Sequence, residues 1–165
     1  MERSDAVIYR EVQRMHQNAL VRYVMPFEAV VMTAVLVPVM ATTGGTTRWV
    51  LLGVLLGFGF ALPALILRWT MTTVVTSDAL LVRFWPLPGK TLLLGDIRSV
   101  EAVAYNPWEA GGWGYRRSRK HHRIWNVSGG HGVRLRWGEA DDEQCLIGSR
   151  EPELLAEAIV MARDA

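Results

Sequence analysis

The longest apolar stretch of the chain covers residues 49–67 and reads WVLLGVLLGFGFALPALIL, without a charged side chain. Arg48 and Trp49 stand at its start, and Arg68 and Trp69 stand at its end. A helix from Arg48 to Arg68 would be about 30 Å long, which matches the hydrocarbon core of a bilayer. Tryptophan prefers the headgroup level and arginine can extend its charge to water, so we expect these four residues to be membrane anchors. The pattern predicts a transmembrane helix.

A second apolar stretch, residues 23–41, precedes the first and is interrupted by Pro26, Glu28 and Pro38. The first proline falls in the opening turn of a helix, where its missing N–H costs little, and the second is expected to kink the far end. The polar run TTGGTT between the two stretches suits the tight loop of a helical hairpin. We therefore expect a transmembrane hairpin over residues 23–69, with arms 23–41 and 49–67.

Two features of this hairpin are candidates for a function. Glu28 is a carboxylate one turn inside a spanning segment, where it either lies at the interface and pairs with Arg22 or Arg68, or belongs to an ion path. Gly53 and Gly57 form a GxxxG pair, a spacing of small residues that lets a second helix approach closely. Their partner is either the first arm or another chain, so a homo-oligomer or a protein partner remains open.

The first 22 residues place Ile8, Val12, Met15 and Ala19 at helical spacing, with charged side chains between them. This pattern predicts an amphipathic juxtamembrane helix over residues 1–22. It would lie on the bilayer surface or on the following domain, and a helix that binds a specific partner is the alternative.

From residue 70 onward the chain changes to short β-branched and aromatic runs separated by turns. The strands are expected at residues 72–76, 79–85, 91–94, 97–105, 123–127, 133–137 and 144–147. The last segment, PELLAEAIVMAR at residues 152–163, has its apolar side chains on one helical face. The fold class is therefore α+β: a transmembrane hairpin followed by a small antiparallel β-barrel or sandwich over residues 70–165, capped by a C-terminal helix.

Charge is distributed unevenly around the hairpin. Several basic residues flank it on the side of both termini, whereas only Arg48 lies near the loop. The positive-inside rule then places both termini and the β-domain in the cytoplasm of a multi-pass protein of the cell membrane. The net charge of +2 is too small to indicate a nucleic-acid binder. Cys145 is the only cysteine, which fits a reducing compartment, and it is expected to be a small core residue.

Five short motifs resemble the bacterial pleckstrin-homology-like (PH-like) domain, in which a C-terminal helix caps two bent sheets. They are YREVQR at residues 9–14, GWGYR at 112–116, WNVSG at 125–129, GVRL at 132–135 and IGSREPEL at 147–154. The whole chain is similar to small bacterial membrane proteins in which a helical hairpin precedes such a domain. The resemblance implies architecture and a binding or assembly role, and it implies no particular ligand.

A basic run inside the domain is the candidate contact surface for membrane lipids or for a protein partner. It comprises Trp113, Arg116, Arg117, Arg119, Lys120 and Arg123. Each basic side chain near an anionic bilayer adds about 1 kcal/mol of attraction, and neighbouring tryptophans would enter the interface. Binding to RNA or DNA would need a broader basic face, so we expect no nucleic-acid partner.

No motif indicates catalysis or a cofactor. The residues His121, His122, His131 and Cys145 have no spacing typical of a zinc site. The acidic residues form no close catalytic pair, and no phosphate-binding glycine loop is present. The leading interpretation is a non-enzymatic membrane protein that displays a cytoplasmic PH-like module. The alternative is an accessory subunit of a membrane transport or envelope complex that docks through its hairpin.

Overall fold

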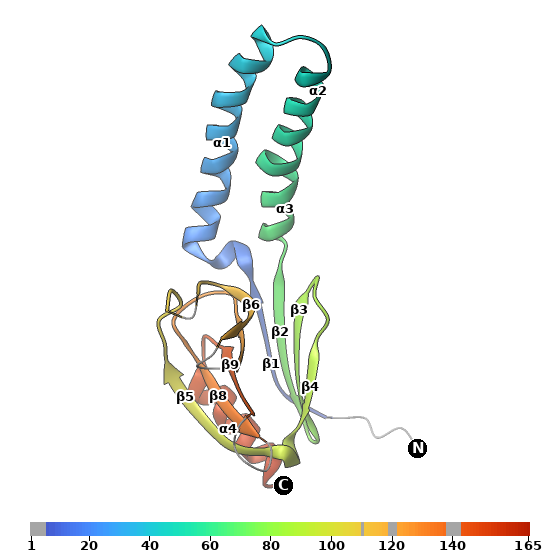
Figure 1. The fold of residues 1–165 in the computed structure, drawn as a ribbon. Helices are drawn as coiled ribbons and strands as arrows, with labels where there is room; N and C mark the ends of the chain where they lie inside the picture. Colours follow the sequence, from blue (N-terminus) through green and yellow to red (C-terminus); the bar gives the residue numbers. More distant parts are fainter. Residues whose placement is uncertain (1–5, 110, 119–121, 138–142) are drawn as a thin grey trace, which may run out of the picture. The chain divides into compact units, whose positions relative to one another are not determined.

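The computed structural model describes residues 6–109, 111–118, 122–137 and 143–165 (Figure 1). The chain forms two compact units. One is a helical unit of residues 14–69, and the other, which we call the β-domain, combines residues 1–13 with residues 70–165.

The helical unit has two arms. The first arm is α1 (Ala19–Thr42), whose N-terminus is capped by Asn18, because its side-chain oxygen accepts hydrogen bonds from the backbone of the next turn at 3.1 and 3.3 Å. The second arm runs through α2 (Gly45–Val54), the π-helical segment η2 (Leu55–Ala61) and α3 (Leu62–Leu67). Both arms are long and apolar enough to cross a membrane, judged by length and composition. Only Thr43 and Gly44 separate them, so the loop is shorter than expected.

Proline accounts for the wide π-helical turns of the second arm. Pro63 lacks the N–H that an α-helix directs to the carbonyl four residues earlier, and its ring would crowd that carbonyl. The preceding segment, η2, instead makes wider turns, and the N–H of Leu62 donates to the carbonyl of Gly57. Such wide turns are a common way to fit a disruption into a helix.

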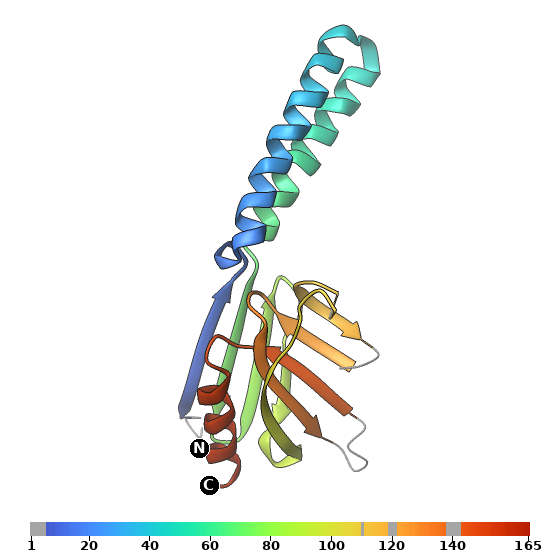
Figure 2. The same cartoon turned by 90° about the vertical axis from the view of Figure 1, so that its left-hand side faces the viewer.

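The β-domain contains two sheets and one long helix (Figures 1 and 2). Sheet A has the order β1-β2-β3-β4, and sheet B has the order β5-β8-β9-β7-β6, in which β7 and β9 are parallel. The strands of sheet A are β1 (Val7–Arg14), β2 (Thr70–Thr76), β3 (Ala79–Trp85) and β4 (Lys90–Leu93). Those of sheet B are β5 (Ile97–Ala104), β6 (Gly114–Ser118), β7 (His122–Asn126), β8 (His131–Trp137) and β9 (Glu143–Gly148). Short 3₁₀ turns, η1 (Met15–Gln17) and η3 (Leu94–Asp96), join elements, and the chain ends with α4 (Pro152–Arg163). The α+β class and the C-terminal helix are confirmed.

The N-terminal segment corrects the sequence analysis. Residues 7–14 form strand β1, so the amphipathic helix predicted over residues 1–22 is wrong for them. The side chains of Tyr9, Glu11 and Gln13 share one face of this strand, as the period of two requires. They reach the junction between β9 and α4, and these contacts override a helical spacing that was present by coincidence.

Glu11 is the centre of these contacts. Its carboxylate accepts hydrogen bonds from the hydroxyls of Tyr9 (3.1 Å) and Ser149 (2.7 Å). It also accepts from the amide of Gln13 (3.1 Å) and the backbone N–H of Arg150 (3.0 Å). The Gln13 amide further donates to the Gly148 carbonyl at 2.8 Å. Burial is the main reason that the pKa of Tyr9 rises to about 12. Strand β1 is therefore bound to β2 along its edge and to residues 148–150 through its side chains.

The helical unit is inserted between two neighbouring strands. Strand β1 ends where the unit begins, β2 starts where it ends, and the two strands are adjacent in sheet A. At the junction, the N–H of Met15 donates to the carbonyl of Trp69 at 2.8 Å. The domain boundary expected at residue 70 therefore leaves out the first strand of the β-domain.

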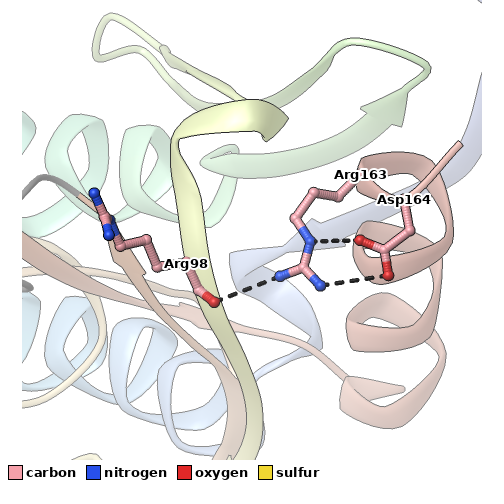
Figure 3. A network of polar contacts seen from close by, with 3 residues as sticks. All are labelled: Arg98, Arg163 and Asp164. Atoms are coloured by element: carbon pink, nitrogen blue, oxygen red, sulfur yellow. Dashed lines mark hydrogen bonds and ion pairs between the residues drawn. The ribbon is translucent and has the colours of Figure 1, made fainter.

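The core lies between the two sheets and under α4. Sheet A contributes Met71, Val75, Leu80, Val82 and Phe84, and sheet B contributes Trp125, Val133, Leu135, Cys145 and Ile147. Helix α4 buries Leu155, Ala158, Ile159 and Ala162 and contacts β5, β8 and β2. Its C-terminal end is held against β5, because the Arg163 guanidinium donates to the Arg98 carbonyl at 3.5 Å and to the Asp164 carboxylate at 2.8 Å (Figure 3).

Candidate functional site

A cavity of about 450 Å³ opens between the two sheets of the β-domain. We call it the inter-sheet cleft; it is lined by Lys90, Thr91, Leu92, Leu93, Asp96, Ile97, Arg123 and Trp137. Strand register explains why charged side chains line it. Lys90 lies opposite the buried Val82, so its side chain is on the inner face of β4. Arg123 lies beside the buried Cys145 and projects from the inner face of β7.

Positive charge predominates in this cleft. The ammonium of Lys90 lies 4.6 Å from the centre of the Trp137 ring, a cation–π contact. Arg123 lies directly opposite Arg117 on β6, and like charges placed opposite each other destabilise a sheet. Neither arginine forms an ion pair with another described residue. Among the described lining residues, Asp96 is the one that carries a carboxylate. Lys90 and Arg123 thus bring two cations to the lining of one cavity.

Cys145 forms part of the core beneath these cations. The side chain is inaccessible to solvent, and burial raises the pKa of its thiol to about 12. The charges of Lys90 and Arg123 act in the opposite direction by a smaller amount, as expected of two nearby cations. A thiol with such a pKa stays protonated at neutral pH and is a poor nucleophile. The arrangement is suited to holding an anion and not to covalent chemistry at Cys145.

The described members of the basic run singled out in the sequence do not share one role. The guanidinium of Arg116 turns back to donate to the Trp113 carbonyl and packs over Gly111, so it organises its own loop. Arg117 is exposed and Arg123 lines the inter-sheet cleft. Arg119, Lys120 and His121 lie outside the described residues. The role of these residues in lipid or partner contact stays a prediction.

The loop before β6 is held by hydrogen bonds that leave one tryptophan exposed. The Asn106 side chain accepts from the N–H of Trp108 at 3.0 Å, and the N–H of Gly111 donates to the Trp108 carbonyl at 3.0 Å. The buried Asn126 bonds the N–H of Gly114 at 3.0 Å and the carbonyl of Gly112 at 3.2 Å. Trp113 is half-buried with its ring 5.2 Å from that of Trp108, yet Trp108 remains 65% exposed.

The glycine pair of the second arm does not pack on the first. A Cβ added at Gly53 or Gly57 would meet nothing within 4 Å, whereas one at Gly59 would lie 3.5 Å from Met32 of α1. Of the two partners considered for the pair, the first arm is therefore wrong, and contact with another chain stays a prediction. Glu28 is half-buried on α1.

The four expected anchors lie at the ends of the second arm. Arg48 and Trp49 are exposed in the first turn of α2, Arg68 follows α3, and Trp69 is half-buried. As for metals, no group of three or more His, Cys, Asp or Glu side chains that could hold an ion occurs among the residues with a described placement.

The sequence analysis singled out Arg123 but missed the other residues that make the cleft. Lys90, Asp96 and Trp137 were assigned to no site. Lys90 and Trp137 are distant in sequence, and no local motif links them; only the closing of one sheet over the other brings them together. Comparison of the chain with protein-family models, with curated proteins and with solved structures finds no match.

Proposed function

We propose that the protein is a non-enzymatic, membrane-anchored binding module. The helical hairpin crosses the cell membrane, and the β-domain is a PH-like sandwich on the cytoplasmic side that holds a soluble anionic ligand in the inter-sheet cleft. The ligand class is inferred from the two cations, Lys90 and Arg123, that line one cavity together with a single described carboxylate, that of Asp96. The two sheets with a C-terminal helix support the PH-like assignment, and the length and apolar composition of both arms support the membrane anchor.

The position of the cleft favours a soluble ligand over a lipid headgroup. Strand β2 starts at Thr70, which follows the last residue of α3 by three positions. The cleft extends to Leu93 and Ile97, and Leu93 pairs with Ala79 at the opposite end of β3 from Trp85, the partner of Thr70. Seven residues of strand span about 20 Å, so much of the cleft lies well away from the point at which the chain leaves the hairpin.

Neutralising either cation of the cleft is expected to weaken anion binding about tenfold or more, since a hydrogen bond to a charged group contributes about 1.5–3 kcal/mol. Inorganic pyrophosphate is a suitable probe, titrated into the full chain in detergent and followed by calorimetry. Lys90→Gln and Arg123→Gln are the test variants. Arg136→Gln is the matched control, because Arg136 is exposed on the same strand as Trp137 but on the opposite face of sheet B. Equal affinity in all three variants, or none in the unmodified chain, would refute the anion site.

The proposed orientation predicts a labelling pattern in intact cells. A cysteine at position 46 (Thr46→Cys), near the tip of the hairpin, is expected to react with a membrane-impermeant maleimide from outside. A cysteine at position 161 (Met161→Cys), exposed on α4, is expected to react only after the cells are made permeable. The native Cys145 is buried, so the unmodified chain is the control and should remain unlabelled. The reverse pattern would invert the topology, and external labelling of both sites would contradict the spanning hairpin.

A second function, the accessory subunit of a membrane transport or envelope complex, is favoured by one observation. The face that carries Gly53 and Gly57 is open in this chain, with space for a neighbouring helix. In that case the hairpin is the docking element, and the cleft variants described above would leave the complex intact.

A further inference from the structure

One end of the β-domain carries exposed apolar side chains beside the point where the chain enters it from the hairpin. Trp85, the last residue of β3, pairs directly with Thr70, the first residue of β2. Trp85 is 49% exposed, and Leu87 in the following turn is 43% exposed. The N–H of Leu87 donates to the Phe84 carbonyl at 2.6 Å, so the turn is closed and holds Leu87 outward.

The described part of the loop between β5 and β6, residues 105–109 and 111–113, lies at the same end of the β-domain, on sheet B. Both views show it level with the β3–β4 turn and with the start of β2 (Figures 1 and 2). The hydrogen bonds of Asn106, Gly111 and Asn126 hold this loop, so the exposure of Trp108 is a property of an ordered loop. Tryptophan combines an apolar ring with a polar indole N–H, so an exposed tryptophan on a hydrogen-bonded loop suits the boundary between an apolar layer and water.

Chain length limits how far this end can be from the bilayer, if the hairpin spans it as proposed above. Thr70 follows Leu67, the last residue of α3, by three positions, which cover at most about 10 Å. Paired residues of neighbouring antiparallel strands have Cα atoms about 5 Å apart, so Trp85 adds little to that distance. The headgroup region is about 5–8 Å thick on each side of the hydrocarbon core. The Cα of Trp85 therefore lies within about 15 Å of the end of α3, so its indole ring can reach the headgroup region.

We infer that this end of the β-domain, with Trp85, Leu87 and Trp108 as its contact residues, rests in the headgroup layer of the bilayer that the hairpin crosses. Tryptophan is the side chain that best suits this layer, because its ring is apolar and its indole N–H can bond to headgroups or water. The contact holds the domain at the membrane surface with the far part of the inter-sheet cleft directed to the solution. This inference rests on the proposed membrane function.

Fluorescent labels on single cysteines test the contact in the full chain. The chain is reconstituted in vesicles of phosphatidylcholine and phosphatidylglycerol, with an environment-sensitive label at position 87 or 108 (Leu87→Cys or Trp108→Cys). We expect quenching by a nitroxide placed near the lipid headgroup and a rate of quenching by aqueous iodide reduced about threefold or more relative to a reference site. The matched reference is Leu93→Cys, because Leu93 is 59% exposed on the next strand but lies at the other end of sheet A.

A fourth label distinguishes failure of the headgroup contact from failure of the membrane anchor. Val35→Cys lies in the second half of α1, within its apolar stretch, and is expected to be quenched by a nitroxide deep in the acyl chains. If position 35 is in the bilayer while positions 87 and 108 are quenched by iodide as fast as position 93, the headgroup contact is overturned and the membrane anchor stands. If position 35 is itself accessible to iodide, the proposed membrane function fails, and this inference fails with it.

Discussion

Replacing residues 14–69 by a two-residue Asn-Gly turn is expected to yield a β-domain that folds in water, whereas residues 70–165 alone are expected not to fold. Strands β1 and β2 are neighbours, and the Met15–Trp69 hydrogen bond shows that the ends of the inserted unit already lie side by side. An Asn-Gly turn joins adjacent antiparallel strands with the twist that a sheet prefers. The shortened chain, which we call the closed domain, would keep every strand of both sheets, with β1 shorter by Arg14.

The fragment without β1 loses an edge strand and the partners of the junction before α4. Glu11 alone accepts four hydrogen bonds, and each bond to a charged group is worth about 1.5–3 kcal/mol. Domains of this size have a free energy of unfolding of about 5–15 kcal/mol, so the loss of β1 is sufficient to unfold this one. Circular dichroism and thermal unfolding measure the outcome. A cooperative transition of residues 70–165 at the midpoint of the closed domain would contradict the prediction.

Two substitutions in the closed domain localise this effect. Glu11→Ala is expected to lower the free energy of unfolding by about 2–3 kcal/mol, because Ser149 and the Arg150 N–H lose their acceptor. Arg10→Ala, at the preceding position of the same strand, changes an exposed side chain. It should change the free energy of unfolding by no more than about 0.5 kcal/mol.

Gly132→Ala is expected to disrupt sheet B at its centre. Gly132 of β8 lies directly opposite Gly148 of β9, and an added Cβ would lie 2.3 Å from the Ile147 carbonyl oxygen and 3.0 Å from the Gly148 Cα. These are backbone atoms, so no side-chain rotation relieves the clash, and β8 must move away from β9. Overpacking of a tight site typically costs about 1–3 kcal/mol, and we expect a loss at or above the upper end. The midpoint of urea unfolding of the closed domain measures it.

Gly95→Ala is the matched control for this substitution. A Cβ added at Gly95, in the turn before β5, would meet no atom within 4 Å, so its effect should remain within about 0.5–1 kcal/mol in either direction. Equal midpoints for the two variants would show that the close approach of β8 and β9 is not a constraint on the fold.

Elements with long, local signals could be predicted from the sequence. The two apolar arms and the helix Pro152–Arg163 each repeat one pattern over many residues, and the strands over 79–85 and 133–137 show clear β-branched or aromatic runs. Strand β1 could not be predicted, because its inward positions 9, 11 and 13 carry polar side chains, whereas Ile8 and Val12 stand at helical spacing. Its identity is decided by β2, from which the whole helical unit separates it in sequence.

The candidate site could not be predicted from the sequence for a related reason. A run of basic residues in the sequence looks like one patch, but successive residues of a strand point to opposite faces. Arg116 is used within its own loop, whereas Arg117 and Arg123 share the inner face of sheet B. The partners of Arg123 across the cleft come from another sheet, and no spacing along the chain encodes that juxtaposition.

If the hairpin crosses the membrane as proposed above, its insertion between β1 and β2 makes folding of the β-domain depend on correct insertion of both arms. During synthesis β1 emerges first and must wait until both arms have been made before its neighbour β2 exists. If only one arm entered the bilayer, the two strands would lie on opposite sides and sheet A could not form. A misinserted chain would then expose the apolar faces of an unfinished sheet to proteases and chaperones, whereas a correctly inserted chain buries them.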